Sequence, residues 1–379
     1  MMTCEVHFAQ KNKEGEEVCG DTVKIKRSEE KTVVSVSDGL GSGIKASILS
    51  TLTASMATTM VFSKVPIEEV FSSIVSTLPT CKVRGISYST LATVSVDHRT
   101  GVCEIYEYDF PVILIYRNSE LVNIEKTSVE IKGRKIYCSK FVSQPGDLIF
   151  LMTDGITQAG MGTKRFPFGF GIENVKFELS NLIKHKVSLE SITQHLVRLA
   201  RALDSGTKGD DATVCVINVR ERKNLTIMVG PPEKKENDTV VVQKLLSADG
   251  KKIICGGTTS QIVERIIGRK VEIDFSSISE ISPPTGYMEG IDLVTEGIIT
   301  LSQVFRYYES QSNKLGIGAQ KIIDMLEEAD LVKFLVGRAI NPAHQNPLFS
   351  HDISLKFRLI HDIAQILQKK GKIVCIEYF

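Results

Sequence analysis

Alternating apolar and polar residues predict β-strands through the first half of the chain. Six segments there are rich in β-branched residues, and several alternate with a period of two. The predicted strands are Thr32–Ser37, Ser89–Val96, Val102–Tyr108, Val112–Tyr116, Leu148–Met152 and Thr213–Val219. A short polar break ending in glycine separates the second and third segments, so we expect them to form an antiparallel hairpin.

Three helices are predicted between these strands. The segment Ile44–Thr59 is rich in Ala, Ser and Thr, which allow a helix to approach a sheet closely. The segment Pro66–Leu78 begins with proline, a favoured first-turn residue, and a second proline follows it. The segment Ser188–Leu203 has a serine at the N-cap position and apolar residues three or four positions apart.

The pattern changes after a charged break at residues 220–224, where strand-like and helix-like segments begin to alternate. The predicted strands are Ile253–Cys255, Val271–Phe275, Asp292–Thr295, Leu331–Val336 and Lys372–Tyr378. The predicted helices are Ser260–Ile267, Gly297–Tyr308, Ala319–Ala329 and Ile353–Lys369. This alternation favours a mostly parallel sheet covered by helices.

Length, charge and hydropathy indicate how many domains the chain has and which kinds of partner it is expected to lack. The 379 residues suggest two or three domains. Lys and Arg total 46 and Asp and Glu total 45, a balance that gives no sign of non-specific nucleic-acid binding. No apolar run approaches the ~20 residues that cross a bilayer, and the charged first twenty residues lack the apolar segment of a signal peptide. We therefore expect neither a nucleic-acid nor a membrane partner.

The eight cysteines are scattered along the chain, and none is paired with another at two-residue spacing. We interpret them as reduced, mostly buried thiols of a cytoplasmic protein. The seven histidines show no ligand spacing either, which argues against a structural zinc site.

Acidic residues recur where predicted strands begin or end. Asp38 and Asp154 each follow a strand and precede a glycine, and Asp-Gly after a strand is by itself a turn signal. Asp21 lies shortly before the first of these sites, and Asp210 and Asp211 precede the last predicted strand of the first half. Such carboxylates would repel one another if the fold gathered them, so a cluster of this kind needs cations.

Oxygen ligands without cysteine or histidine suit Mg²⁺ or Mn²⁺. Two such ions bridged by one carboxylate lower the pKa of a shared water and produce a nucleophile near neutral pH. A phosphate monoester is the natural electrophile, because the ions also neutralise its oxygens. The acidic pattern therefore favours metal-dependent phosphate-ester hydrolysis.

Three motifs resemble a known family. The segments VSVSDGLGSG, LMTDG and GDDATV, in this order, are similar to the metal-dependent protein phosphatases (PPM family), and in particular to the branch named for the bacterial stage II sporulation protein E. The resemblance covers roughly residues 1–220. It implies an α-β-β-α sandwich of two antiparallel sheets, so the expected fold class is α+β, followed by a smaller α/β domain with a mostly parallel sheet.

The resemblance also implies a role for each acidic residue. Asp38 would bridge two Mn²⁺ or Mg²⁺ ions, and the carbonyl of Gly39 would bind the second ion together with Asp21. Asp154 and Asp210 would be the remaining ligands of the first ion. The wider family often has asparagine at the position of Asp211, whose metal role is therefore less defined. Asp38, Asp154 and Asp210 are the expected catalytic residues.

The sequence departs from many eukaryotic members of the family in one respect. No arginine near Asp21 matches their phosphate-binding arginine, and the sporulation branch is expected to lack it too. The glycine-rich segment 39–43 is either a flexible connection or a loop whose backbone amides face the substrate phosphate at a helix N-terminus. Arg84, in the segment 83–88, is interpreted as a solvated side chain.

A second candidate site lies in the later half. The five residues Gly256, Gly257, Thr258, Thr259 and Ser260 separate a short predicted strand from a helix. They either cap that helix or bind the anionic group of a small-molecule effector through backbone amides. No Walker motif follows them. His344, in a polar loop, is interpreted as a structural loop residue.

These observations predict a phosphatase domain over residues 1–222 and a regulatory or ligand-sensing α/β domain over 223–379. The predicted activity is hydrolysis of phosphoserine or phosphothreonine in a protein, which the family resemblance suggests is a small regulatory protein. One alternative is a module that binds phosphoproteins without turnover. Another places a sugar-phosphate or nucleotide function in the C-terminal domain.

Overall fold

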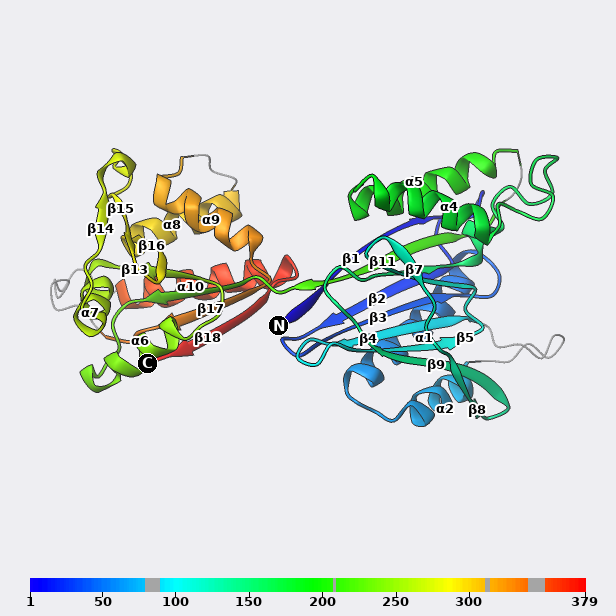
Figure 1. The fold of residues 1–379 in the computed structure, drawn as a ribbon, viewed down its shortest axis with the longest axis horizontal. Coiled ribbons are helices and arrows are strands. Elements are labelled where there is room, and N and C mark those ends of the chain that lie inside the picture. The colour runs from blue at the N-terminus through cyan, green and yellow to red at the C-terminus, as the bar shows by residue number, and fades with distance from the viewer. Residues whose placement is uncertain (79–88, 207–208, 311–313, 340–351) are drawn as a thin grey trace. The chain divides into compact units, whose positions relative to one another are not determined.

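The chain divides into two compact units, Met1–Glu221 and Arg222–Phe379 (Figure 1). The computed structural model describes residues 1–78, 89–206, 209–310, 314–339 and 352–379. The predictions for Arg84 and His344 lie outside the described residues. Within those residues, no helix combines the length and apolar character needed to cross a membrane.

Two antiparallel sheets form the N-terminal unit, with strand orders β2-β3-β4-β5-β9-β8 and β1-β11-β10-β6-β7. The strands of the first sheet are β2 (Asp21–Arg27), β3 (Lys31–Asp38), β4 (Leu91–Asp97), β5 (Val102–Tyr108), β8 (Thr127–Ile131) and β9 (Arg134–Val142). The strands of the second are β1 (Met2–Lys11), β6 (Val112–Arg117), β7 (Glu120–Val122), β10 (Leu148–Met152) and β11 (Ala212–Glu221). The predicted hairpin is confirmed as the antiparallel pair β4–β5.

Helices cover the outer face of each sheet (Figure 1). The helices of this unit are α1 (Gly43–Phe62), α2 (Ile67–Thr77), α3 (Asp154–Thr157), α4 (Ile172–Lys184) and α5 (Leu189–Leu203). The first two share a core with strands of the first sheet, and the last two share one with the second sheet. Ser188 is the N-cap of α5, as predicted, and its side chain accepts a hydrogen bond from the amide of Ser191. Pro66 is an N-cap residue rather than part of α2.

A third core lies between the two sheets. Val34 and Val94 of the first sheet belong to the same buried cluster as Ile149 and Ile217 of the second, and none is more than 1% exposed. Successive side chains of a strand point to opposite faces: in β10, Ile149 and Leu151 lie in this core, whereas Phe150 and Met152 lie in the core shared with the helices. The N-terminal unit is therefore an α-β-β-α sandwich, which confirms the expected fold.

The C-terminal unit contains one seven-stranded sheet in the order β14-β15-β16-β13-β12-β17-β18. Its strands are β12 (Asn224–Val229), β13 (Lys251–Cys255), β14 (Glu272–Asp274), β15 (Thr285–Met288), β16 (Ile291–Thr295), β17 (Leu331–Val336) and β18 (Ile373–Tyr378). The five strands from β16 to β18 in this order pair in parallel, whereas β14 and β15 are antiparallel. The predicted mostly parallel sheet is confirmed.

Helices cover both faces of this sheet. They are α6 (Asp238–Leu246), α7 (Gly257–Ile267), α8 (Ile298–Ser310), α9 (Ile317–Glu328) and α10 (Asp352–Lys369). Residues of α6 and α7 form one core with the sheet, and residues of α8, α9 and α10 form another on its other face. From β12 the chain adds β13 and β16 on one side, and it later adds β17 and β18 on the other. The strand order therefore reverses between β12 and β17.

Candidate active site

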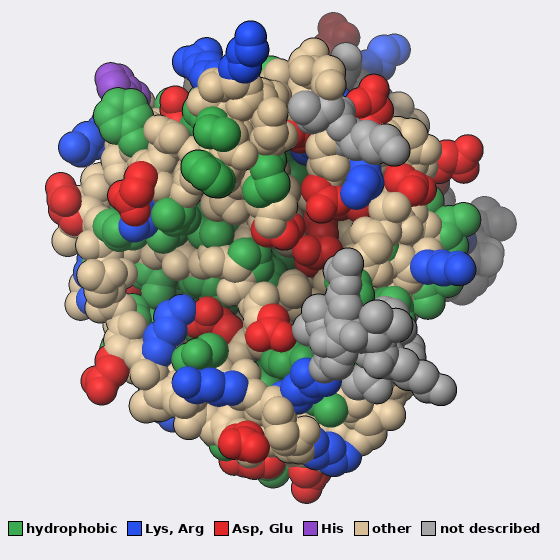
Figure 2. Space-filling model, turned by 90° about the vertical axis from the view of Figure 1, so that its right-hand side faces the viewer, with side chains coloured by type: hydrophobic (Ala, Val, Ile, Leu, Met, Phe, Trp, Pro, Cys, Tyr) green, Lys and Arg blue, Asp and Glu red, His purple; other side chains and the backbone are tan. Residues whose placement is uncertain are grey.

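Asp21 and Asp38 face each other across β2, an edge strand of the first sheet, and its neighbour β3. Asp21 begins β2, Asp38 ends β3, and the antiparallel register pairs them directly. Cα atoms of directly opposed residues are about 4.5–5.5 Å apart, so the two carboxylates lie close together. Figure 2 shows acidic side chains gathered in a hollow, with hydrophobic side chains beside them.

The second sheet holds the Asp21 carboxylate in place. One of its oxygens, Oδ2, accepts hydrogen bonds from the hydroxyls of Thr153, at 2.8 Å, and Thr213, at 2.7 Å. The Thr153 hydroxyl oxygen in turn accepts a hydrogen bond from the Thr213 amide at 2.8 Å. The other oxygen, Oδ1, is buried and has no hydrogen-bond partner. A buried, unpartnered carboxylate oxygen is costly, and a bound cation would satisfy it.

Asp154 is the first residue of α3 and is separated from the end of β10 by Thr153 alone. Its Oδ2 accepts a hydrogen bond from the side-chain amide of Gln158 at 2.7 Å, which fixes the orientation of the carboxylate. Burial, followed by the charge of Asp210, raises the pKa of Asp154. Asp154 and Asp210 are therefore near enough to repel each other.

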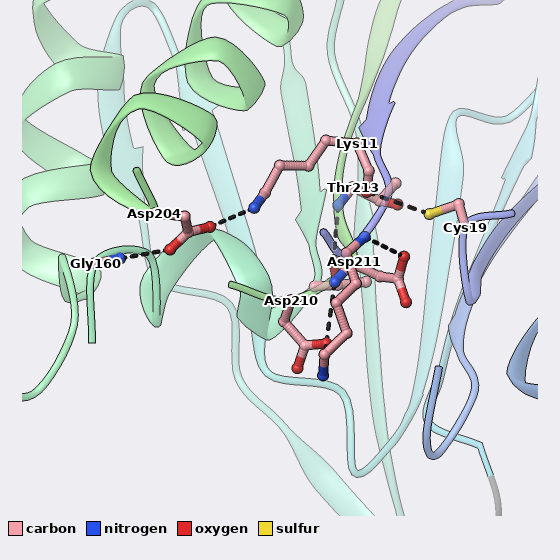
Figure 3. Close-up of polar contacts among 9 residues, drawn as sticks. Lys11, Cys19, Gly160, Asp204, Asp210, Asp211 and Thr213 are labelled. Atoms are coloured by element: carbon pink, nitrogen blue, oxygen red, sulfur yellow. Dashed lines mark hydrogen bonds and ion pairs between the residues drawn. The ribbon is translucent and has the colours of Figure 1, made fainter. Parts of the chain in front are cut away.

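Asp210 and Asp211 precede β11 and contact the connection between β1 and β2 (Figure 3). The Lys13 ammonium lies 3.2 Å from Oδ1 of Asp210. The Lys13 amide donates to Oδ1 of Asp211 at 3.0 Å. Lys13 thus brings a positive charge to the acidic cluster.

The pKa values of the two facing aspartates show how strongly the site disfavours negative charge. Burial, followed by the charges of Asp21 and Asp154, raises the pKa of Asp38 far above its ordinary value. Burial also raises the pKa of Asp21, although its two threonine hydrogen bonds oppose the rise. Positive charge at this site would lower both pKa values again.

Two glycines allow the backbone to approach closely beside the cluster. A Cβ on Gly39 would lie 2.1 Å from the carbonyl oxygen of Ala46 in α1. A Cβ on Gly155 would lie 2.0 Å from the carbonyl oxygen of Asp211. The glycines of both Asp-Gly pairs are therefore required by packing, and they bring α1 and β11 against the two acidic strand ends.

The donor set fits Mn²⁺ or Mg²⁺ in its chemistry, because the clustered side chains are carboxylates and one buried oxygen of Asp21 has no partner. In the described residues, however, no three acidic, histidine or cysteine side chains converge closely enough to hold an ion as they stand. The structure thus brings the predicted ligands together without arranging them into a finished coordination shell. Their metal role stays a prediction.

The glycine-rich segment before α1 is already contacted by an acidic side chain. The Ser42 hydroxyl donates to Oε1 of Glu16 at 2.7 Å, and a Cβ on Gly43 would lie 2.2 Å from Oε2 of Glu16. The Glu16 carboxylate therefore lies at the N-terminus of α1. The predicted contact of this segment with a substrate phosphate stays a prediction.

Sequence patterns missed a buried ion pair beside the cluster (Figure 3). Lys11 of β1 pairs with Asp204, which follows α5, and the exposed fractions of the two side chains are 4% and 9%. The second oxygen of Asp204 accepts the Gly160 amide at 2.7 Å. Three segments are joined here: β1, the end of α5 and the loop after Asp154. No strand was predicted over residues 2–11, so the sequence pattern gave no signal for this pair.

In the C-terminal unit, the predicted segment Gly256–Ser260 is only partly a turn. Gly256 is the N-cap of α7, and the helix includes the next four residues rather than starting at Ser260. The reason is that Gly256 adopts a positive φ of 115°, which turns the chain directly into the helix. The side chain of Thr259 consequently lies in the first turn of α7.

The N-terminal unit is similar to several solved structures. Similar solved structures include the SpoIIE phosphatase domain from Bacillus subtilis, with 21% identity, coverage of 58% of this chain and 93% of that chain, and a TM-score of 0.43. RsbX in complex with magnesium is 18% identical. The match covers 58% of this chain and 100% of that chain, with a TM-score of 0.42. The SiaA-PP2C domain of Pseudomonas aeruginosa is 15% identical. The match covers 56% of this chain and 85% of that chain, with a TM-score of 0.43.

No curated protein matches the chain. The family model named "Stage II sporulation protein E (SpoIIE)" matches residues 28–220, which is just over half of the 379 residues. All three motifs that carry the resemblance lie within this range. The chain belongs to the stage II sporulation protein E family.

Proposed function

We propose that the N-terminal unit hydrolyses phosphoserine or phosphothreonine in a protein substrate and uses two Mn²⁺ or Mg²⁺ ions. The observation that carries this proposal is the convergence of four acidic strand-end sites that repel one another. Asp38 interacts electrostatically with Asp21, Asp154 and Asp210. Family membership supports the same reaction class.

Each side chain has a proposed place in this site. Asp38 is the bridging ligand, and its central position among the other carboxylates supports that role. Asp21 and the Gly39 carbonyl are the proposed ligands of one ion, and Asp154 and Asp210 are the proposed ligands of the other. Asp211 also belongs to the proposed metal set, although one of its oxygens accepts the Lys13 amide and so also fixes the β1–β2 connection.

When bound, two dications would supply a water of lowered pKa and would neutralise the oxygens of the phosphate. The protein prepares for this chemistry by orienting its ligands. Thr153 and Thr213 hold one oxygen of Asp21, which leaves the other free for a cation. Gln158 holds one oxygen of Asp154. Lys13 partly balances the acidic charge at Asp210.

We further propose that a small regulatory phosphoprotein is the substrate and that the C-terminal unit senses an anionic effector. Each of the two alternative functions predicts a different experimental result. A phosphoprotein-binding module would bind phosphopeptides without releasing phosphate. A sugar-phosphate or nucleotide function in the C-terminal unit would not depend on the acidic cluster of the N-terminal unit.

The direct test is phosphate release from phosphoserine, phosphothreonine and phosphotyrosine peptides by the full chain, with Mn²⁺, with Mg²⁺ and with EDTA. We expect multiple turnovers on the first two peptides with either metal and none with EDTA. Binding of these peptides without phosphate release would contradict the proposal and favour a binding module. Hydrolysis limited to phosphotyrosine would contradict the proposed substrate class.

A further inference from the structure

Glycines follow the ends of four neighbouring parallel strands in the C-terminal sheet. Gly230, Gly256 and Gly337 directly follow β12, β13 and β17, and Gly297 follows β16 after one further residue. The Gly256 amide donates to the Thr295 carbonyl at 2.9 Å, and the Gly337 amide donates to the Val229 carbonyl at 2.9 Å. The four glycines therefore lie next to one another along one edge of the sheet.

This edge contains the point where the strand order reverses. The chain leaves β12 towards α6 on one face of the sheet, and α10 lies on the opposite face between β17 and β18. In open α/β sheets, ligands bind beyond the carboxyl ends of the strands at such a reversal. The relevant strand ends here are those of β12 and β17.

A buried lysine lies at these two strand ends. Lys356 of α10 is only 8% exposed, and its ammonium donates a hydrogen bond to the Gly337 carbonyl. A Cβ on Gly230 would lie 2.8 Å from Nζ of Lys356. Within the described part of the chain, no carboxylate forms an ion pair with Lys356. The ammonium also lies over the Phe357 ring, 5.1 Å from its centroid. Among the described residues its partners are therefore a carbonyl and an aromatic ring, which compensate a buried charge poorly, and an anion at the strand ends would offset that cost.

A second buried polar group lies at the neighbouring strand end. Thr259 is 1% exposed, and its Oγ1 has no hydrogen-bond partner. A Cβ on Gly256 would lie 3.0 Å from this hydroxyl, so the hydroxyl faces the turn that follows β13. A Cβ on Gly257 would meet no atom within 4 Å, so the first turn of α7 is open on that side.

We propose that this edge of the sheet binds a small molecule through a phosphate group. Lys356 supplies the opposite charge, and the Thr259 hydroxyl and the backbone amides at the start of α7 supply further hydrogen bonds. Glycine backbones permit close approach, and helix N-termini favour phosphate. With Lys356, the proposed site reaches from the segment 256–260 to the ends of β12 and β17, where the strand order reverses. The proposal does not depend on the phosphatase reaction of the N-terminal unit.

The test uses the full chain carrying Asp38→Asn, in EDTA, so that phosphate binding at the acidic cluster is disfavoured. Inorganic phosphate, pyrophosphate and citrate are titrated by calorimetry. Hydrogen exchange is followed with and without pyrophosphate. We expect saturable binding of pyrophosphate, with slower exchange in peptides covering residues 229–232, 255–260 and 336–339. Absence of binding, slower exchange only around residues 38–43, or binding of citrate alone would overturn the proposal.

Two variants test the assigned side chains. Lys356→Met removes the charge and Thr259→Val removes the hydroxyl at similar volume. We expect affinity for pyrophosphate to fall about 10- to 100-fold in the first variant and several-fold in the second. Thermal unfolding without pyrophosphate should occur at an equal or higher temperature, because each change removes a poorly satisfied buried group.

The matched control is Lys270→Met, an exposed lysine beyond the other end of α7. Its affinity for pyrophosphate should equal that of the parent protein. Unchanged affinity in folded Lys356→Met would overturn the assignment of this lysine. If Lys356→Met does not fold, Lys356 has a structural role, and unchanged affinity in Thr259→Val together with no slower exchange at the strand ends would then overturn the site.

Discussion

Asp21 and Asp38 are paired directly across β2 and β3, and neither carboxylate has a basic side chain as a hydrogen-bond or ion-pair partner among the described residues. Directly opposed like charges destabilise a strand pair. The Asp21 side chain is nonetheless fixed by the hydroxyls of Thr213 in β11 and of Thr153, which follows β10. The fold thus holds an unfavourable pair of charges in a defined place, as a cation-binding site requires.

This relationship predicts that the metal-free protein loses stability as the pH rises. Both folded-state pKa values are raised above the ordinary 3.8, that of Asp38 to about 9. The folded state therefore binds more protons than the unfolded state, and the free energy of unfolding falls between about pH 4 and pH 9. We expect the unfolding temperature in EDTA to fall by roughly 5 °C or more over this range.

Asp38→Asn is the comparison for this prediction. The amide does not ionise, so the fall in unfolding temperature between pH 4 and pH 9 should be smaller than in the wild type. Saturating Mn²⁺ should raise the unfolding temperature of the wild type most at high pH, because it binds the folded state. Identical pH profiles for the two proteins would show that Asp38 is not a strained carboxylate.

Asp154→Asn and Asp210→Asn should weaken one metal site. Each change removes a charged ligand while keeping the shape of the side chain, so the Mn²⁺ concentration for half-maximal activity should rise. The rate at fixed low Mn²⁺ should fall on the order of 10²-fold. Titration of activity with Mn²⁺ measures both effects. A lower rate with an unchanged Mn²⁺ requirement would indicate that these residues act without binding the metal.

The buried pair of Lys11 and Asp204 should matter for stability. Lys11→Met removes the ammonium that balances the buried Asp204 carboxylate, which costs about 3–5 kcal/mol of unfolding free energy. Adding Asp204→Asn to this variant should restore part of the loss, because a neutral amide is less costly to bury. Chemical denaturation of the single and double variants measures the difference.

The exposed pair of Lys140 and Glu104 provides a control, because Lys140 is 69% exposed. Lys140→Met should leave the unfolding midpoint nearly unchanged. Equal effects of Lys11→Met and Lys140→Met would show that burial of the first pair has no energetic consequence.

Short runs rich in apolar and β-branched residues were enough to predict the strands that are buried on both faces. β3, β4 and β10 consist almost entirely of buried residues, and all three were predicted within two residues of their bounds. β2 was missed because Lys24, Lys26 and Arg27 hide its pattern at the edge of the sheet. α4 was missed because few of its residues are buried; only Val175 and Leu179 are.

The candidate site could be predicted only as a set of residue types at strand ends. The Asp-Gly motifs gave Asp38 and Asp154, and the family resemblance gave their roles. The contacts of the lysines at positions 11 and 13 depend on pairing between β1 and β11, which are about 200 residues apart in the chain. The threonines that orient Asp21 are brought together by pairing between β10 and β11. Lys356 was missed for a similar reason, because its burial at the reversal point depends on how α10 packs against the sheet.

Asp38 is central to the proposed site, so replacing it gives the most direct test. The measurement is the rate of p-nitrophenyl phosphate hydrolysis by the full chain at saturating Mn²⁺, for the wild type, Asp38→Asn and Asp249→Asn. Asp249 is an exposed aspartate of the C-terminal unit, and its variant controls for the same chemical change. We predict that Asp38→Asn abolishes turnover while remaining folded, because a neutral amide does not bridge two dications, and that Asp249→Asn retains the wild-type rate. Metal-dependent turnover by Asp38→Asn at close to the wild-type rate would contradict the account.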